Sequence, residues 1–404
     1  MSLPLSHRSA NMPASPIRKL APFAVAAAAR GIKIYHLNIG QPDIPTPDTF
    51  WDAVKNTDIS VLEYSPSDGI MPLREGMAKY YQSIGIDVTA AQIMVTTAGS
   101  EALSIAMNVC CNEGDEIIVP EPMYANYLGF SRACNVNVVA IPTRIEDNFA
   151  LPDAADIAKR ITPKTKAILN CNPGNPTGTI YSRDQMIALG EIAREHGLFI
   201  ISDEVYREFN YTDTPLTSAL QLEGLDANTI MVDSVSKRFS LCGARVGFLV
   251  SRNPTFNAAA LKYAQARLSP PMLEMIGTLG ALDTPRSYFD DVRTEYMKRR
   301  DLLVSRLRSM PGVVCPDIEG AFYATVRLPI DNADTFCQWL LESFDHNGET
   351  VMFAPASGFY ETDGAGVDEV RIAYVLDTDR LGKAMDCLEA ALAAYPGRKV
   401  AANA

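Results

Sequence analysis

The stretch DSVSKRFSLCGARVG, residues 233–247, places an amine, several hydroxyls and a guanidinium close together in a turn-prone segment. Lys237 can attack an aldehyde only when it is neutral, and a desolvated pocket with a neighbouring cation such as Arg245 favours that state. The hydroxyls of Ser234 and Ser236, with the forked guanidinium, are suited to binding a phosphate group. Taken alone, a lysine after a buried strand is more often a solvated cation, so other segments must decide.

Two further segments place polar side chains where expected strands end. Asp203 and Tyr206 follow an apolar run that ends at Ile201, and Asn175 lies in a proline-fixed turn after a run that ends at Leu169. Strand-like runs alternate with helical stretches, which predicts a largely parallel sheet with crossover helices. Because open α/β sheets bind ligands at the carboxyl ends of their strands, we expect these side chains to share one pocket with the lysine.

In this order and spacing, the three segments resemble those of the fold-type I pyridoxal-phosphate enzymes, specifically the class I and II aminotransferases. The likeness extends from about residue 13 to about residue 394, and the residues of its motifs are similar to those of a bacterial aspartate-aminotransferase-like subgroup. It implies an α/β fold with a three-layer α/β/α unit, a mostly parallel seven-stranded sheet, and a smaller α+β domain built from both termini.

The resemblance also implies domain boundaries. Residues 1–46 are expected to form an N-terminal arm and part of the small domain, residues 47–284 the large cofactor-binding domain, and residues 285–404 the small C-terminal domain.

The family assigns three catalytic roles to residues of this chain. Lys237 is expected to form a Schiff base with pyridoxal 5′-phosphate, and Asp203 to pair with the pyridine nitrogen so that the ring accepts electrons. Tyr206 and Asn175 are expected to bind the phenolic oxygen of the ring, and Tyr124 to stack on its face. Singly, each has a structural alternative as a helix cap, a turn residue or a core aromatic.

The phosphate is expected to bind where the strand-like residues 93–97 lead into a helical pattern, because a helix N-terminus attracts anions. Tyr64 resembles a tyrosine that reaches the phosphate of a neighbouring subunit, which implies a homodimer with shared active sites. The implied phosphate-binding residues are Gly99, Ser100, Glu101 through its amide, Ser234, Ser236, Arg245 and Tyr64.

Arg371 lies inside a strand-like run near the C-terminus. A buried arginine without an anionic partner is costly, so a ligand carboxylate is a reasonable partner. The family uses this position to bind the substrate α-carboxylate, with Asn175 and the Gly40 backbone nearby. The competing interpretation is a structural salt bridge.

The substrate side chain is less well specified. Two positions at which relatives carry a cation that binds the side-chain carboxylate of a substrate are occupied here by Ala264 and Glu101, so neither of these arrangements is present. Arg267 and His36 are candidate substitutes, although each is more often structural at such a place.

These parts predict transamination, in which an amino group moves from an L-amino acid to a 2-oxo acid by ping-pong kinetics. Aspartate or glutamate with 2-oxoglutarate is one expected pair. The same cofactor also supports a carbon–sulfur β-lyase, which is the alternative enzyme. A non-catalytic regulatory module is a third reading, which the complete set of catalytic residues disfavours.

Composition limits the partners further. The net charge is −12 and no basic cluster stands out, so no nucleic acid is expected to bind. The eight cysteines lack metal-ligand spacing and indicate reduced thiols of a cytoplasmic protein, with no metal. Residues 18–29 look like a signal peptide but are better explained as a docking helix, too short to span a membrane.

Overall fold

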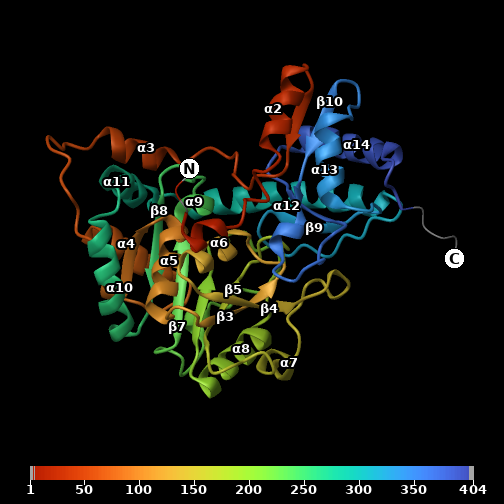
Figure 1. Ribbon diagram of the computed structural model, residues 1–404. Coiled ribbons are helices and arrows are strands. Elements are labelled where there is room, and N and C mark those ends of the chain that lie inside the picture. The colour runs from red at the N-terminus through yellow and green to blue at the C-terminus, as the bar shows by residue number, and fades with distance from the viewer. Residues whose placement is uncertain (1–2, 4, 400–404) are drawn as a thin grey trace.

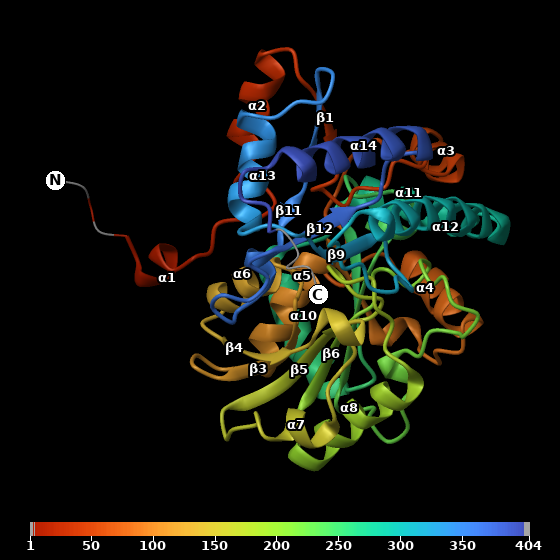
Figure 2. The same ribbon diagram turned by 90° about the vertical axis from the view of Figure 1, so that its right-hand side faces the viewer.

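The computed structural model describes residues 3 and 5–399, so the outer ends of the expected first and last units lie outside the described residues. Figure 1 and Figure 2 show a larger unit that contains β2 to β8 and, above it, a smaller unit in which α2 from the N-terminal part of the chain packs against α13 from the C-terminal part. Among the described residues, no helix combines the length and apolar character needed to cross a bilayer.

The larger unit is built on a seven-stranded sheet with the order β2-β8-β7-β6-β5-β3-β4. β8 is antiparallel to both of its neighbours and every other pair is parallel. The predicted mostly parallel seven-stranded sheet is therefore confirmed. Its strands are β2 (Ile93–Thr97), β3 (Glu116–Glu121), β4 (Asn137–Pro142), β5 (Thr165–Cys171), β6 (Phe199–Asp203), β7 (Thr229–Ser234) and β8 (Val246–Val250).

Helices cover both faces of this sheet because successive strand residues point to opposite sides. Ile117 and Ile201 pack with α5 and α10 on one face, whereas Ile118 and Ile200 pack with α8 on the other. This is the expected three-layer arrangement. The helices of the unit are α3 (Asp48–Lys55), α4 (Met71–Ser83), α5 (Ala98–Cys110), α6 (Asn126–Ala133), α7 (Ala154–Ala158), α8 (Arg183–His196), α9 (Val235–Arg238), α10 (Pro254–Arg267) and α11 (Met272–Ala281), with 3₁₀ turns η1 (Ala90–Gln92), η2 (Ile145–Asp147) and η3 (Ala219–Gln221).

The smaller unit joins the two ends of the chain. β1 (Lys33–His36) pairs in parallel with β10 (Glu349–Met352), and α2 packs against α13. A second sheet orders β11-β12-β9 in antiparallel fashion. The remaining elements are β9 (Tyr323–Arg327), β11 (Ala354–Pro355), β12 (Glu369–Ala373), α1 (His7–Ala10), α2 (Ala21–Ala29), α12 (Arg286–Ser309), α13 (Ala333–Glu342), α14 (Thr378–Ala394) and η4 (Ala356–Phe359).

The smaller domain from both termini is thus confirmed as part of the fold, and α2 is the expected docking helix. The domain boundaries after residues 46 and 284 stay predictions.

Candidate active site

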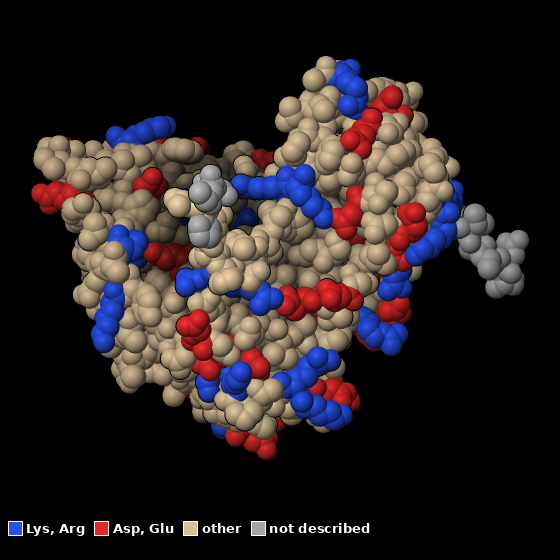
Figure 3. Space-filling model, viewed as in Figure 1, with Lys and Arg blue, Asp and Glu red and all other residues tan. Residues whose placement is uncertain are grey.

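A cavity of about 520 Å³ lies at the carboxyl end of the large sheet, between the two units. Figure 3 shows the hollow between the units, with basic side chains at its edge. β5, β6 and β7 each end at it, which is where an open α/β sheet binds ligands. Its walls include Ser15, Ile17, Arg18, Gly40, Gln41, Gly99, Ser100, Tyr124, Asn126, Cys171, Asn175, Asp203, Tyr206, Ser234, Ser236, Lys237, Cys242, Arg245, Tyr323 and Arg371.

Asp203 ends β6 and its side chain points into this cavity. It is 5 % exposed, accepts a hydrogen bond from the Tyr127 hydroxyl at 2.7 Å, and forms no ion pair among the described residues. Burial raises the pKa of the Asp203 carboxyl to about 6, although the hydrogen bond from Tyr127 opposes the shift. A cationic partner placed in the cavity would therefore stabilise the carboxylate.

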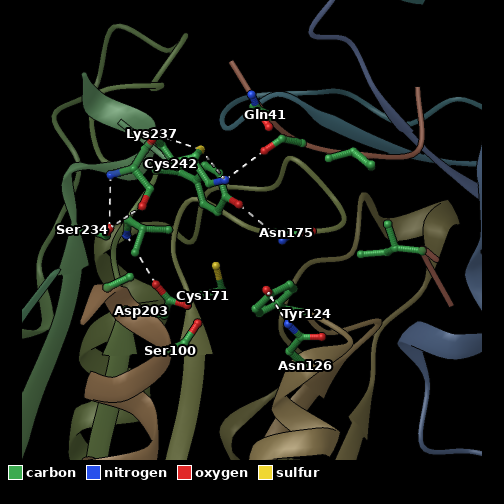
Figure 4. A pocket seen from close by; sticks show the side chains of 18 of the residues that line it. Gln41, Ser100, Tyr124, Asn126, Cys171, Asn175, Asp203, Ser234, Lys237 and Cys242 are labelled. Atoms are coloured by element: carbon green, nitrogen blue, oxygen red, sulfur yellow. Dashed lines mark hydrogen bonds between the residues drawn. The ribbon is translucent and has the colours of Figure 1, made fainter. Parts of the chain in front are cut away.

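Lys237 lies in the short helix α9, directly after β7. Its Nζ donates to the Gly40 carbonyl at 2.8 Å and lies 3.6 Å from the Cys242 Sγ. Figure 4 shows Lys237, Ser234 and Asp203 on one side of the cavity, across from Tyr124, Asn126 and Asn175. The amine and the carboxylate, 34 positions apart in sequence, thus line one cavity, as predicted.

The phosphate side of the cavity is formed by the N-terminus of α5 and the turn before β8. Gly99 and Ser100 line it from α5, where backbone N–H groups are free of helical partners. Ser234 donates to the Ser236 hydroxyl at 2.9 Å. Arg245 donates to the Cys242 carbonyl at 3.0 Å and has no acidic partner among the described residues. Hydroxyls, amide donors and a free guanidinium are the groups that bind a phosphate.

β8 approaches this helix N-terminus very closely. A Cβ at Gly247 would lie 2.4 Å from the Ala98 carbonyl carbon and 2.6 Å from the Gly99 nitrogen. Ala98 and Arg245 both adopt positive φ, 62° and 57°, which is uncommon for residues with a side chain. The backbone therefore holds the expected phosphate site under strain, as binding sites often do.

Arg371 is the buried cation at the other side. It is 1 % exposed, lies between the rings of Tyr323 and Phe359, and donates to the Asn175 Oδ1 at 3.2 Å and to the Asn38 carbonyl. Burial lowers its pKa. Its Nε has no hydrogen-bond partner and it makes no ion pair among the described residues. The structural salt bridge is thus not found, and the guanidinium is available to a carboxylate.

The ring-binding candidates also meet. Asn175 donates to the Tyr206 hydroxyl at 3.4 Å, and the Tyr206 and Tyr323 hydroxyls lie 3.0 Å apart. Burial raises the pKa of the Tyr206 phenol well above its ordinary value, so it stays protonated and can donate. Tyr124 accepts a hydrogen bond from Asn126 at 2.8 Å at the opposite wall.

Four candidates do not line the cavity. Glu101 bonds through its carboxylate to the Thr97 N–H and to Arg267, with 2.9 Å in the ion pair. Arg267 is therefore paired within this chain, and its role toward the substrate side chain stays a prediction. His36 lies exposed on β1 and does not line the cavity, so its role toward the substrate side chain also stays a prediction. Tyr64 is 80 % exposed, so its role toward a second subunit stays a prediction.

Sequence reasoning missed several residues of the site. The Tyr127 hydroxyl donates to Asp203, the Tyr323 hydroxyl lies within hydrogen-bond distance of the Tyr206 hydroxyl, and Cys242 lies beside Lys237. Arg18 lines the cavity from the N-terminal segment. Only Tyr127 had a local signal, because it lies three positions after the predicted ring-stacking Tyr124, although Tyr124 itself precedes the helix α6.

The residues present fit pyridoxal phosphate. The cavity holds an amine and a buried carboxylate that forms no ion pair within the described part of the chain, and it places anion-binding groups at a helix N-terminus. A group with a cationic nitrogen, an aldehyde and a phosphate would satisfy all three.

Comparison with known proteins agrees with this geometry. The family model for aminotransferase class I and II matches residues 32–385. An aspartate aminotransferase of Pyrococcus horikoshii is 30 % identical over 365 residues, which cover 89 % of this chain and 90 % of that protein. Aromatic-amino-acid aminotransferase 2 of Thermococcus litoralis is 31 % identical over 395 residues, with 96 % and 98 % covered.

A solved alanine aminotransferase from Pyrococcus furiosus superposes with a TM-score of 0.87 at 29 % identity, covering 96 % of this chain and 99 % of that one. These relatives do not favour the carbon–sulfur lyase alternative. The chain therefore belongs to the class I and II aminotransferases, the pyridoxal-phosphate-dependent enzymes that transfer amino groups between amino acids and 2-oxo acids.

Proposed function

We propose that this aminotransferase works through the cavity described above, with Lys237 as its catalytic amine. The observation that supports this most directly is the meeting of three groups in one cavity: Lys237, the buried Asp203, and Arg371 with its partnerless Nε. Pyridoxal phosphate would be held by Lys237 at its aldehyde, by Asp203 at its ring nitrogen, and by the serines and Arg245 at its phosphate. When bound, it supplies a ring that accepts the electron pair released at the substrate Cα.

The protein's own groups perform the remaining tasks. Arg371 would bind the substrate α-carboxylate through two N–H groups and so orient the Cα. The Lys237 amine, released from the Gly40 carbonyl, would take the proton from that carbon. The Tyr206 hydroxyl would donate a hydrogen bond to the ring's phenolic oxygen, and the Tyr124 ring would exclude water from one face.

The test is Lys237→Ala against the surface variant Lys262→Ala. We expect Lys237→Ala to lower the turnover number by several orders of magnitude, on the order of 10⁴-fold or more, because both the attachment point and the proton carrier are lost. Lys262 is exposed on α10, and its variant should behave like the parent.

A half-reaction measurement separates transamination from elimination. With an amino acid and no acceptor, the enzyme should form about one 2-oxo acid for each subunit and then stop, because ping-pong turnover needs a second 2-oxo acid to restart it. Continuous release of ammonia and pyruvate from cysteine or cystathionine would instead identify a β-lyase.

We also propose that the active unit is a two-fold homodimer in the cytoplasm. The run of residues 59–64 carries exposed apolar side chains, with Val61 65 % and Leu62 60 % exposed. Leu62 lines a second hollow that also contains Arg245, so this apolar run borders the phosphate side of the active site. A second copy would cover it and bring Tyr64 to a phosphate.

A further inference from the structure

The cavity carries one more cation than the proposed chemistry uses. Its charged lining residues are Asp203 and the cations Arg18, Lys237, Arg245 and Arg371. The proposed function employs Lys237 as the amine, Arg245 at the phosphate and Arg371 at the α-carboxylate. Arg18 has no task, although the molecule as a whole carries a net charge of −12.

Arg18 is free to bind an anion. Its side chain is exposed and forms neither an ion pair nor a hydrogen bond among the described residues. The next residue differs in this respect, because Lys19 pairs with Asp334 on α13. Arginine binds a carboxylate through two parallel N–H groups, which suits it to binding the carboxylate of a flexible ligand.

The backbone around Arg18 is held in place. Pro16 is buried against Gly358, where an added Cβ would lie 2.4 Å from the proline Cβ. The Lys19 N–H donates to the Ser15 carbonyl at 3.0 Å, which closes a turn around Arg18. Leu20 is buried in the core of the smaller unit. Arg18 therefore projects from a fixed turn with anchored residues on both sides.

The same turn is bonded to the wall that carries Arg371. Arg371 donates to the Asn38 carbonyl, and the Asn38 Nδ2 donates to the Ile17 carbonyl at 3.2 Å. Arg18 follows Ile17 directly, and both line the cavity. The buried Arg371 guanidinium and the backbone of the turn that carries Arg18 are thus both hydrogen-bonded to Asn38.

We propose that Arg18 binds the side-chain carboxylate of the substrate, and that this chain prefers dicarboxylic amino acids and their 2-oxo acids. Arg371 takes the α-carboxylate and Arg18 the distal one, so the two ends of a short dicarboxylate are bound by two arginines of the same wall. Neither Arg267 nor His36 of the described chain lines the cavity, whereas Arg18 does. The inference rests on the proposed function, since it assigns the α-carboxylate to Arg371.

The test compares Arg18→Gln, Arg18→Lys and the neighbouring control Lys19→Gln in the holoenzyme. We expect Arg18→Gln to lower the ratio of kcat/KM for L-aspartate to that for L-alanine by ~10- to 100-fold, the size of a lost charge-assisted hydrogen bond. Arg18→Lys should retain part of the preference because the charge remains without the fork. Lys19→Gln should leave the ratio unchanged.

A binding measurement gives a second readout without turnover. Calorimetry should find that the parent binds succinate more tightly than butyrate, which has the same four carbons and one carboxylate fewer, and that Arg18→Gln removes this difference. An unchanged aspartate-to-alanine ratio in Arg18→Gln, or equal binding of succinate and butyrate by the parent, would overturn the proposal. Absence of amino transfer from every donor would instead contradict the proposed function, while the succinate and butyrate comparison would still test Arg18.

Discussion

At the scale of single residues, Asp203 shows how the fold prepares a site at the expense of its own stability. Its carboxylate is buried and forms no ion pair among the described residues, where it accepts hydrogen bonds only from the Tyr127 hydroxyl and the Val205 N–H. Burying a charge without a counter-ion is unfavourable, so the cofactor-free protein carries a cost that a cationic ligand removes.

This cost predicts a pH-dependent gain from Asp203→Asn in the cofactor-free protein. The carboxyl has a pKa of about 6 when folded and an ordinary value of 3.8, so the folded state binds the proton more tightly and stability falls as pH rises between them. Removing the group should raise the free energy of unfolding at pH 8 by roughly 2 to 3 kcal/mol, with no gain near pH 4. Urea unfolding at several pH values measures this.

Asp363→Asn is the matched control, because that carboxylate is exposed on a loop. Its variant should change stability little at either pH. A pH-independent effect of Asp203→Asn, or a loss of stability at pH 8, would contradict the burial argument. In both outcomes the holoenzyme variant should lose most of its turnover, because the ring nitrogen loses its anionic partner.

At the scale of elements, the contact between β8 and the start of α5 shapes the phosphate side of the site. Gly247 lies opposite Gly99 and Ala98, and the absent side chain lets the strand approach the helix N-terminus. The N–H groups of α5 therefore lie beside Ser234, the last residue of the neighbouring β7, so both elements line the same cavity.

Gly247→Ala should destabilise the protein by about 1 to 3 kcal/mol, because the new methyl group overlaps backbone atoms that cannot move aside singly. Gly129→Ala is the matched control on α6: no atom lies within 4 Å of its added Cβ, so a helical alanine should stabilise by about 0.5 to 1 kcal/mol. Thermal unfolding of both variants checks the pair. Equal stability changes of the same sign in the two variants would show that the close approach of β8 to α5 does not affect the stability of the protein.

At the scale of the whole molecule, two features indicate that the active site takes residues from more than one part of the assembly. They are the cleft between the two units and the exposed run 59–64. The small unit supplies Arg371 and Arg18, the large unit supplies Lys237 and Asp203, and a second copy is proposed to supply Tyr64. Such a division places the proposed substrate-binding arginines and the proposed cofactor-binding residues on different units.

Mixing two inactive or weakened variants tests the shared site. Lys237→Ala alone should be inactive, and Tyr64→Ala alone should bind cofactor more weakly. After subunit exchange, one site of each hybrid dimer has neither substitution, because the intact lysine meets the partner's intact tyrosine. Activity at limiting cofactor should then exceed the mean of the two parents. A mixture that only equals that mean would place Tyr64 outside the neighbouring site.

Part of the fold was predictable because strands and helices leave local patterns. The run 93–97 predicted β2 and the following helix, and the apolar run before Asp203 predicted β6. The lysine and Asp203 were placed in one cavity because parallel strands end at the same edge of a sheet. Tyr323 and the Arg18 turn were not predictable as site residues, because contacts in this wall join distant segments, such as Asn38 and Arg371, which are 333 positions apart, and periodicity reports only neighbours in the chain.

The amino-acid sequence alone predicted the family, because the order of an amide, a carboxylate and an amine at expected strand ends resembles that of the class I and II aminotransferases, but it left the carbon–sulfur lyase open as an alternative. Tertiary structure alone decided which cations line the cavity. It paired Arg267 with Glu101 and left Arg18 free at the cavity opening. The physical reason is that a charged side chain is available to a ligand only when no opposite charge of the protein pairs with it. Only the folded arrangement decides which partners are within reach.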